Sequence, residues 1–296
     1  MKLIVRMRGG LGNQMFQYAY ALALRDRYPG AGIVLDTREY ETYTRRSFAL
    51  TDFVLAENTT LFSRGRLAYD VPIRLYHVWQ RLYREVRHEH PFGVNESLAG
   101  RGLVLTGLGC PLPRADLPET TFLYGYFQNA EVLLPIRETL RNAYSLPASG
   151  LAGLSPALLD AGDEAAAVSI RLGGDIVKSG WQLCSREYYR AGIEEIRRTD
   201  TVKKLLIFSD APERVAGEKW FDDMDLELVY ASGLSPASQM ELLKRCRRFV
   251  ISNSTFAWWG AFLGAGTEGV IVAPKIWQGN RPTEKDSLYL KNMILL

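Results

Sequence analysis

The sequence has 296 residues, of which 47% are hydrophobic and 23% are charged. This composition excludes a disordered or fibrous chain and provides apolar material for one large domain or two ordinary ones. The 36 basic and 33 acidic side chains give a net charge of +3, so bulk charge does not support a polyanion-binding face, although a local pocket for a small anion is compatible with it. All three histidines, His77, His88 and His90, lie in one short stretch. Catalysis in the C-terminal half would therefore proceed without imidazole.

The cysteines and the first residues predict the cell compartment. Cys110, Cys184 and Cys246 are odd in number, widely spaced and without a nearby histidine, which argues against a zinc site or a disulfide framework and favours a reducing cytoplasm. Arg6 and Arg8 interrupt the apolar start before a secretory core could form. We expect a cytoplasmic protein without a transmembrane segment, with peripheral attachment at the inner face of the cell membrane left open.

The first 36 residues predict a strand, a glycine turn, a helix and a second strand. Residues 2–7 are apolar and β-branched, and residues 13–28 carry apolar side chains at helical spacing until Pro29. The second strand, over residues 33–35, ends at Asp36. The glycine turn then lies at the carboxyl edge of the first strand, where open α/β sheets bind ligands. Residues 40–120 show no sustained period, and no elements are predicted there.

The C-terminal half predicts a second α/β domain. Residues 145–163 are rich in Ala, Gly, Leu, Ser and Pro, which indicates a connection between domains at residues 1–147 and 148–296. Strands and helices then alternate, which predicts a parallel sheet covered on both faces. The fold class is therefore α/β, with two Rossmann-like domains facing across a cleft. The expected strands cover residues 166–170, 204–208, 226–230, 249–252 and 270–273, and the expected helices cover residues 185–198, the vicinity of Glu213, and residues 235–248 and 255–263.

Polar residues follow three of these strands. Because the carboxyl ends of parallel strands meet at one sheet edge, we expect them to lie together as a nucleotide site. Asp210 could accept hydrogen bonds from a base or a ribose, or it could cap the helix that begins at Pro212. Ser254 and Thr255 precede an apolar helix and would form an anion site with its first N–H groups, unless they are ordinary N-caps. The candidate donor-binding residues at this edge are Arg171, Ser209, Asp210, Asn253, Ser254 and Thr255.

Arg171 is the strongest candidate of this set. Its guanidinium is a planar, permanently charged fork for a phosphate, and Gly173 and Gly174 would let backbone approach the same anion. The alternative is a surface ion pair with Asp175.

The N-terminal glycine turn is similar to a dinucleotide-binding fingerprint at Gly10 and Gly12, with Asp36 at a suitable distance. Met15 occupies the place of the third glycine, which disfavours a nicotinamide site. Asn13 and Gln14 are instead expected to present their amides to the cleft.

Two further motifs have simpler interpretations. The sequence Asp223-Met224-Asp225 has the spacing with which some sugar-nucleotide transferases hold a divalent cation. It precedes a strand, on the side away from the expected ligand edge, so we interpret it as a solvated turn. Trp258 and Trp259 fall inside an apolar helix and are expected to serve packing rather than stacking on a ligand.

Taken together, these segments resemble the bacterial alpha-1,2-fucosyltransferases of glycosyltransferase family eleven. The resemblance extends from Leu3 to about Trp277 and is thin over residues 40–120. The matching runs are residues 9–19 (GGLGNQMFQYA), 125–128 (GYFQ), 207–210 (IFSD) and 251–261 (ISNSTFAWWGA).

The resemblance implies inverting transfer of L-fucose from GDP-fucose to a hydroxyl, the 2-OH of galactose, without a metal or other cofactor. Its implied partners are the GDP-sugar donor and a galactose-containing oligosaccharide or lipid-linked glycan, with no nucleic acid. Departure of GDP places negative charge on the β-phosphate, which Arg171, Ser254 and Thr255 would stabilise. Gly10 and Gly12 would also contact the donor. Asp175 is the candidate base, with loss of the acceptor proton to water or to the phosphate itself as the alternative, and Asn13 would position the acceptor or the phosphate.

The sequence departs from the H-x-R-R-x-D motif of this family. The corresponding residues 168–175 read VSIRLGGD, with Ser169 in place of the histidine, Arg171 as the one arginine and one added glycine. Aligning backward from Asp175 without a gap would instead replace both arginines. We prefer the first alignment, because it keeps the strand pattern of Val168 and Ile170 together with the arginine fork. Arg248 also stands where many members have a histidine. These departures keep three alternatives open: a transferase with another nucleotide-sugar donor, a catalytically degenerate sugar-nucleotide or glycan-binding protein, and, most distantly, a nicotinamide-dependent oxidoreductase.

Overall fold

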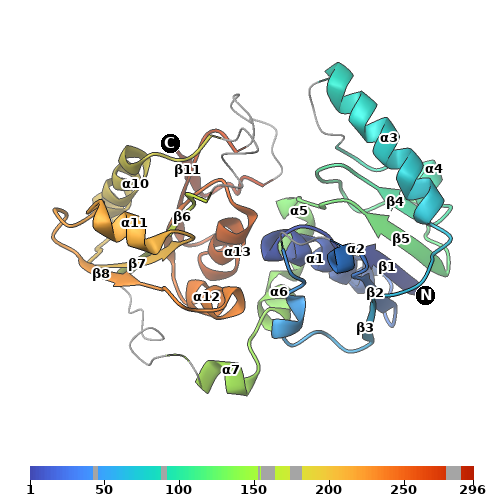
Figure 1. Cartoon of the computed structure of the whole chain (residues 1–296), viewed down its shortest axis with the longest axis horizontal. Helices are drawn as coiled ribbons and strands as arrows, with labels where there is room; N and C mark the ends of the chain where they lie inside the picture. Colours follow the sequence, from blue (N-terminus) through green and yellow to red (C-terminus); the bar gives the residue numbers. More distant parts are fainter. Residues whose placement is uncertain (43–45, 88–91, 153, 155–163, 174–181, 278–287) are drawn as a thin grey trace. The chain divides into compact units, whose positions relative to one another are not determined.

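The computed structural model describes residues 1–42, 46–87, 92–152, 154, 164–173, 182–277 and 288–296. The chain divides into two compact units, Met1–Ala143 (unit 1) and Tyr144–Leu296 (unit 2), and Figure 1 colours them along the sequence. This division falls four residues before the boundary expected between residues 147 and 148. Each unit contains one sheet.

Unit 1 is built on a five-stranded parallel sheet with the order β3-β2-β1-β5-β4. The central strand β1 is covered on both faces, which is why its apolar run Leu3, Ile4 and Val5 is continuous rather than alternating. The strands are β1 (Lys2–Arg6), β2 (Gly32–Asp36), β3 (Thr59–Phe62), β4 (Leu103–Leu105) and β5 (Thr120–Tyr124).

The helices of unit 1 confirm the predicted start and fill the stretch left unassigned. Helix α1 (Leu11–Arg27) begins before Asn13, so Gly12 lies in its first turn and Gly10 is its N-cap. Helix α3 (Asp70–Arg87) packs on β4 and β5 mainly through Ile73, its one buried side chain. The other elements are α2 (Glu39–Thr42), η1 (Leu50–Asp52), α4 (Glu96–Ala99), α5 (Ala130–Leu133), η2 (Leu134–Ile136) and α6 (Arg137–Ala143).

Unit 2 contains a six-stranded parallel sheet with the order β11-β10-β9-β6-β7-β8. Every strand predicted in this half is present within one residue at either end. The strands are β6 (Ala165–Ile170), β7 (Lys204–Ser209), β8 (Glu227–Tyr230), β9 (Arg248–Ile251), β10 (Val270–Ala273) and β11 (Met293–Leu295).

The helices of unit 2 follow the predicted alternation with one error. The helix expected over residues 235–248 ends at Leu243, because the chain turns before β9 begins at Arg248. Trp258 and Trp259 are fully buried, and Trp258 stacks on Phe262 with ring centroids 4.7 Å apart, which confirms their packing role. The helices are α7 (Ala148–Ala152), α10 (Arg186–Thr199), α11 (Pro212–Gly217), α12 (Pro236–Leu243) and α13 (Thr255–Gly264).

The three cysteines carry free thiols, with Cys110 and Cys246 buried and Cys184 half-buried. Burial raises the pKa of the Cys110 and Cys246 thiols to about 12 and that of Cys184 to about 11. In the described part of the chain, no helix combines the length and the apolar character that crossing a membrane requires.

Candidate functional site

The sheet of unit 2 brings three polar segments to one edge. Ile170 pairs in register with Ser209, and Ser169 pairs with Ile251, so β6 lies between β7 and β9. Arg171, Asp210 and the run from Ser252 to Thr255 therefore leave neighbouring strands at the same carboxyl edge. The sequence predicted this juxtaposition, because the carboxyl ends of parallel strands meet at one edge of a sheet.

Asp210 organises the loop that follows β6. Its carboxylate accepts hydrogen bonds from the backbone N–H groups of Leu172 (2.8 Å) and Gly173 (2.9 Å), and its Oδ2 lies 3.4 Å from Nε of Arg171. The N-cap of α11 is Ala211, so the expected alternative that Asp210 caps this helix does not hold. Asp210 instead holds the backbone around Arg171 in place.

The partners of the neighbouring candidates also differ from expectation. Ser209 is half-buried, and its Oγ accepts from the backbone N–H of Ala211 at 3.0 Å. Asp175, the candidate base and the alternative ion-pair partner of Arg171, lies outside the described residues. The ion pair that the structure describes for Arg171 is with Asp210.

The start of helix α13 forms the other part of this edge. Ser254 is the N-cap in extended conformation, but its side chain makes no capping hydrogen bond. The expected alternative of an ordinary side-chain cap is therefore wrong for Ser254, and its hydroxyl and the half-buried Thr255 stand beside the first N–H groups of the helix. An anion placed there would meet backbone donors and the positive end of the helix dipole.

Asn253 and Ser252 lie beneath this helix start. The Nδ2 group of buried Asn253 donates to the carbonyl oxygens of Gln182 (3.0 Å) and Trp277 (3.3 Å) and so holds two segments of unit 2 together. Within the described residues, Asn253 Oδ1 and Ser252 Oγ are buried and accept or donate no hydrogen bond. Buried polar atoms of this kind normally have a partner.

In unit 1, the amides of the N-terminal motif mainly fold the glycine turn. Gln14 is fully buried; its Nε2 donates to the carbonyls of Gly9 (3.0 Å) and Ser47 (2.9 Å), and its Oε1 accepts from the N–H of Ala49. The expectation that Gln14 presents its amide to a ligand is therefore wrong. Gly10 supports the same turn, since its carbonyl accepts from the N–H groups of Asn13 and Gln14.

Asn13 differs from Gln14 because it is only half-buried. Its Oδ1 accepts from Nε2 of Gln128 at 3.1 Å, so the first two sequence motifs meet at the carboxyl end of β1. The side chain of Asn13 is thus oriented by Gln128 while part of it is accessible. Gly12 is buried in the first turn of α1.

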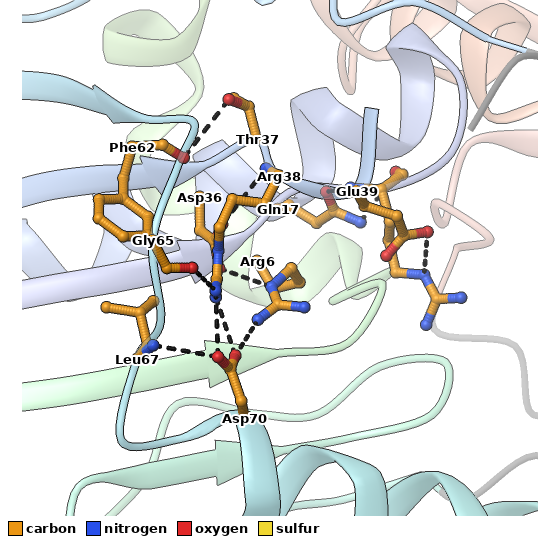
Figure 2. A network of polar contacts seen from close by, with 11 residues as sticks. Arg6, Gln17, Asp36, Thr37, Arg38, Glu39, Phe62, Gly65, Leu67 and Asp70 are labelled. Atoms are coloured by element: carbon orange, nitrogen blue, oxygen red, sulfur yellow. Dashed lines mark hydrogen bonds and ion pairs between the residues drawn. The ribbon is translucent and has the colours of Figure 1, made fainter. Parts of the chain in front are cut away.

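A charged network at the end of β1 and β2 was not predicted (Figure 2). Asp36 is fully buried, and its carboxylate accepts from Arg6 (2.6 Å) and from Arg38 (2.8 and 2.9 Å). Asp70, at the start of α3, accepts from the same two arginines at 2.8 Å each. The hydrogen bond from Arg38 holds the pKa of Asp70 well below its usual range. Because both arginines occupy the carboxylate of Asp36, it is not available to bind the ribose of a nicotinamide cofactor.

A pocket of about 340 Å³ opens beside this network. Desolvation, followed by the charges of Arg8, Arg6 and Arg81, lowers the pKa of His77, so its imidazole is neutral near pH 7. Seven of its eight lining residues have polar or charged side chains, although their apolar atoms also contribute to its wall. Its volume is at the lower end of the range of ligand sites, about 300–1,000 Å³. The signal that could have found it is the placement of Arg6 and Arg38 at strand ends. Its lining residues are Arg6, Arg38, Glu39, Thr42, Asp70, Ile73, Arg74 and His77.

Two residues singled out in the sequence lie away from the candidate edge of unit 2. Asp223 is held by a two-pronged ion pair with Arg190 of α10, at 2.6 and 2.8 Å, before β8 begins. Arg248 stands at the first residue of β9, at the amino end of the strand, where its Nε donates to Asp200 at 2.5 Å. Arg248, for which the resemblance implies a histidine, therefore lies at the opposite end of β9 from Ser252.

The two parallel sheets with their helices have the fold of GT-B glycosyltransferases. The structure is similar to crystal structures of the fucosyltransferase NodZ. One, from Bradyrhizobium, has a TM-score of 0.51 and 16% identity and covers 88% of this chain and 93% of that one. The other, of NodZ alpha-1,6-fucosyltransferase soaked with GDP-fucose, has a TM-score of 0.52 and 15% identity, with coverage of 89% and 92%.

The sequence identifies the family. The family model "Glycosyl transferase family 11" matches residues 105–296, so the chain belongs to that family and is a glycosyltransferase. It is 24% identical over 305 residues to the O-antigen biosynthesis glycosyltransferase WbnK of Escherichia coli, covering 92% of this chain and 93% of that protein. It is also 24% identical over 288 residues to an alpha-1,2-colitosyltransferase of Escherichia coli, with coverage of 93% and 92%. These relatives confirm the resemblance stated from the motifs.

Proposed function

We propose that this glycosyltransferase moves L-fucose from GDP-fucose to the 2-OH of a galactose residue in a surface glycan under assembly, with inversion and without a metal ion. The observation that carries the proposal is the convergence of Arg171, the uncapped start of α13 and the loop held by Asp210 at one edge of the sheet of unit 2. An edge with one guanidinium and a set of backbone donors is suited to a single diphosphate.

The proposed chemistry depends on charge that develops as GDP departs. The β-phosphate gains negative charge while the sugar becomes oxocarbenium-like, so donors aimed at that phosphate favour the transition state over the ground state. Arg171 would supply the fixed positive charge, and Ser254, Thr255 and the first N–H groups of α13 would supply hydrogen bonds. Asp210 keeps the backbone of Leu172 and Gly173 in position, which pre-organises the arginine.

The pocket of unit 1 is the place that we propose for the acceptor glycan. Sugars are recognised by planar polar groups that accept and donate hydrogen bonds to neighbouring hydroxyls, and Arg74, Glu39 and the neutral His77 provide such groups on its wall. Because the Arg6, Arg38, Asp36 and Asp70 charges compensate one another, the pocket suits an uncharged hydroxyl-rich ligand better than an anion.

The donor assignment is tested by transfer from GDP-fucose to a terminal galactoside in the presence of a chelator, with the linkage read by NMR. We expect an alpha-1,2 product, a thermal shift with GDP and none with UDP or ADP. Thermal shift and turnover with a uridine or adenosine donor, but none with GDP-fucose, would overturn the assignment. GDP binding without transfer to any galactoside would instead support the degenerate binding protein.

The role of Arg171 is tested in the same assay with a matched control. Arg171→Lys retains the charge but loses the fork, and we expect turnover to fall about a hundredfold. Arg214→Lys is the control, since Arg214 forms an exposed ion pair with Glu218 on α11. Equal turnover of the two variants would remove Arg171 from the donor site.

The alpha-1,2-colitosyltransferase relative favours one second candidate, transfer of a different sugar with the same linkage. Competition between GDP-fucose and GDP-colitose at equal concentration distinguishes the two, because the preferred donor has the higher kcat/KM.

A further inference from the structure

Helix α3 leaves an apolar face uncovered. Ten large apolar side chains are exposed in the described part of the chain, and six of them belong to this helix. Their exposed fractions range from 48% for Trp79 to 76% for Val86. Monomeric soluble proteins rarely expose contiguous apolar surface of this kind, and such a patch marks an interaction site. The six residues of this apolar face are Val71, Leu75, Val78, Trp79, Leu82 and Val86.

The spacing of these residues places them on one side of the helix. Val71, Leu75, Val78, Leu82 and Val86 follow one another at intervals of three or four residues, which is one stripe of a helix with 3.6 residues per turn. The opposite side is the one that packs: Ile73 is buried among Phe122 and Tyr124 of β5, and Tyr76 and His77 lie against the ring of Tyr124. The exposed stripe thus faces away from the sheet of unit 1.

The charges and aromatic rings of α3 indicate what covers this stripe. Four arginines, Arg74, Arg81, Arg84 and Arg87, are exposed along the helix, against the carboxylates of Asp70 and Glu85. Asp70 is engaged by Arg6 and Arg38, so Glu85 is the one carboxylate of the helix left to offset these four arginines, and the exposed part of the helix carries a net positive charge.

The aromatic pair Trp79 and Tyr83, with ring centroids 5.2 Å apart, borders the stripe. Tryptophan and tyrosine favour the boundary between apolar and polar phases. A positive helix with an apolar stripe and bordering aromatic rings has the composition of an interfacial membrane helix.

We propose that α3 binds the surface of an anionic lipid bilayer, lying in the plane of the interface with its apolar stripe among the acyl chains and its arginines at the headgroups. A second copy of the chain fits less well, because two such helices would bring the same positive flanks together with one glutamate each to offset them. An anionic bilayer compensates these charges and also covers the stripe. Figure 1 shows that α3 is a straight rod whose C-terminal end extends beyond the sheet of unit 1, which leaves room for such contact.

Flotation of the full chain with lipid vesicles tests this proposal independently of any transfer activity. We expect binding to vesicles of phosphatidylcholine mixed with phosphatidylglycerol, and much weaker binding to phosphatidylcholine alone. Replacing Arg81 and Arg84 with Gln should weaken partition about fivefold for each arginine, and added salt should weaken it as well. Equal binding to both kinds of vesicle would overturn the role of the arginines.

The apolar stripe is tested with a matched pair of double variants. Leu75→Ser with Leu82→Ser should reduce partition more than tenfold, because each leucine loses apolar burial. Val54→Ser with Leu61→Ser is the control, since these side chains of unit 1 are exposed to a similar degree but lie outside α3. The proposal would be contradicted if both double variants lost vesicle partition to the same extent, or if neither lost any.

Trp79 provides a readout that does not depend on the serine variants folding. Subtracting the fluorescence emission spectrum of Trp79→Phe from that of the wild type isolates the emission of Trp79. We expect the maximum of this difference spectrum to move to shorter wavelength when anionic vesicles are added. No shift would overturn the proposal. A dimer in light scattering that Leu75→Ser with Leu82→Ser converts to a monomer would assign the stripe to a second copy instead.

Discussion

The Nε atom of Arg171 lies 3.4 Å from Oδ2 of Asp210, where β6 and β7 end. Both side chains are partly exposed, so solvent screens their attraction and the pair contributes little to stability. The same carboxylate accepts two backbone hydrogen bonds from the loop of Leu172 and Gly173. An arriving phosphate can therefore compete for the guanidinium without leaving Asp210 unpaired.

The arrangement predicts a donor-binding defect for Asp210→Asn. The amide accepts through one oxygen and has no charge, so one loop hydrogen bond and the ion pair are lost. We expect the donor KM to rise about tenfold, the equivalent of one lost hydrogen bond to a charged group, with a smaller change in kcat. Steady-state kinetics with Asp225→Asn as the control checks this, because Asp225 lies on an exposed turn of the same unit. An unchanged donor KM would mean that the loop does not depend on Asp210.

The contact between Asn13 and Gln128 predicts measurable coupling between two motifs. Each side chain contributes one group to a half-buried hydrogen bond of 3.1 Å. A double-mutant cycle with Asn13→Ala and Gln128→Ala should give an interaction free energy of about 1 kcal/mol in chemical unfolding. If the two effects add within the error of the measurement, the hydrogen bond does not stabilise the glycine turn.

Gly125 is expected to tolerate no side chain. A Cβ atom there would lie 2.3 Å from Cγ2 and 2.6 Å from the carbonyl oxygen of Thr106, and the latter is backbone that cannot turn aside. We expect Gly125→Ala to lower the free energy of unfolding by about 3 kcal/mol, at the upper end of overpacking effects. Gly217→Ala is the matched control, because nothing lies within 4 Å of the position that its new methyl group would take. Thermal unfolding of the two variants checks this, and equal unfolding midpoints for Gly125→Ala and Gly217→Ala would contradict the prediction.

His77 predicts a pH dependence of stability. Because burial and nearby arginines lower its pKa in the folded chain, the unfolded chain binds a proton more readily. The contribution of His77 to the free energy of unfolding should be fully present above pH 6.5, the ordinary pKa of histidine. It should be lost as the pH falls below that value toward the lower pKa of the folded chain. His77→Gln removes this contribution, so the difference in free energy of unfolding between the variant and the wild type should change between about pH 8 and pH 5. A constant difference across that range would show that the imidazole is not desolvated.

The alternation of unit 2 could be predicted because each of its signals is local. Strand β7 is an uninterrupted apolar run, and helices α10 and α12 begin at serines whose side chains cap them: Ser185 accepts from the N–H of Tyr188 and Ser235 from that of Ser238. The alternation predicted a parallel sheet, and the general rule that its carboxyl ends share one edge placed Arg171 and Asp210 together. The order of the strands in that sheet was not predicted.

The remaining features depend on partners that are distant in the sequence. Helix α12 ends at Leu243, and the next residue, Lys244, donates to the carbonyl of Tyr144, 100 positions away. Asp36 ends its strand as predicted, but its commitment to Arg6 and Arg38 requires the end of β1 to meet the end of β2. The interpretation of residues 40–120 as a stretch without a sustained period was wrong for α3, whose apolar side chains recur at helical spacing. That spacing fits a buried or an exposed face equally well, so it could not have assigned the face.

The buried thiols give each unit a chemical reporter of its own opening. Modification requires a thiolate that reagent can reach, and burial withholds both from Cys110 in unit 1 and from Cys246 in unit 2. The rate at which each thiol is alkylated under native conditions therefore measures how often its surroundings open. One labelling experiment, resolved by peptide, would show whether the two halves of this enzyme unfold together or separately.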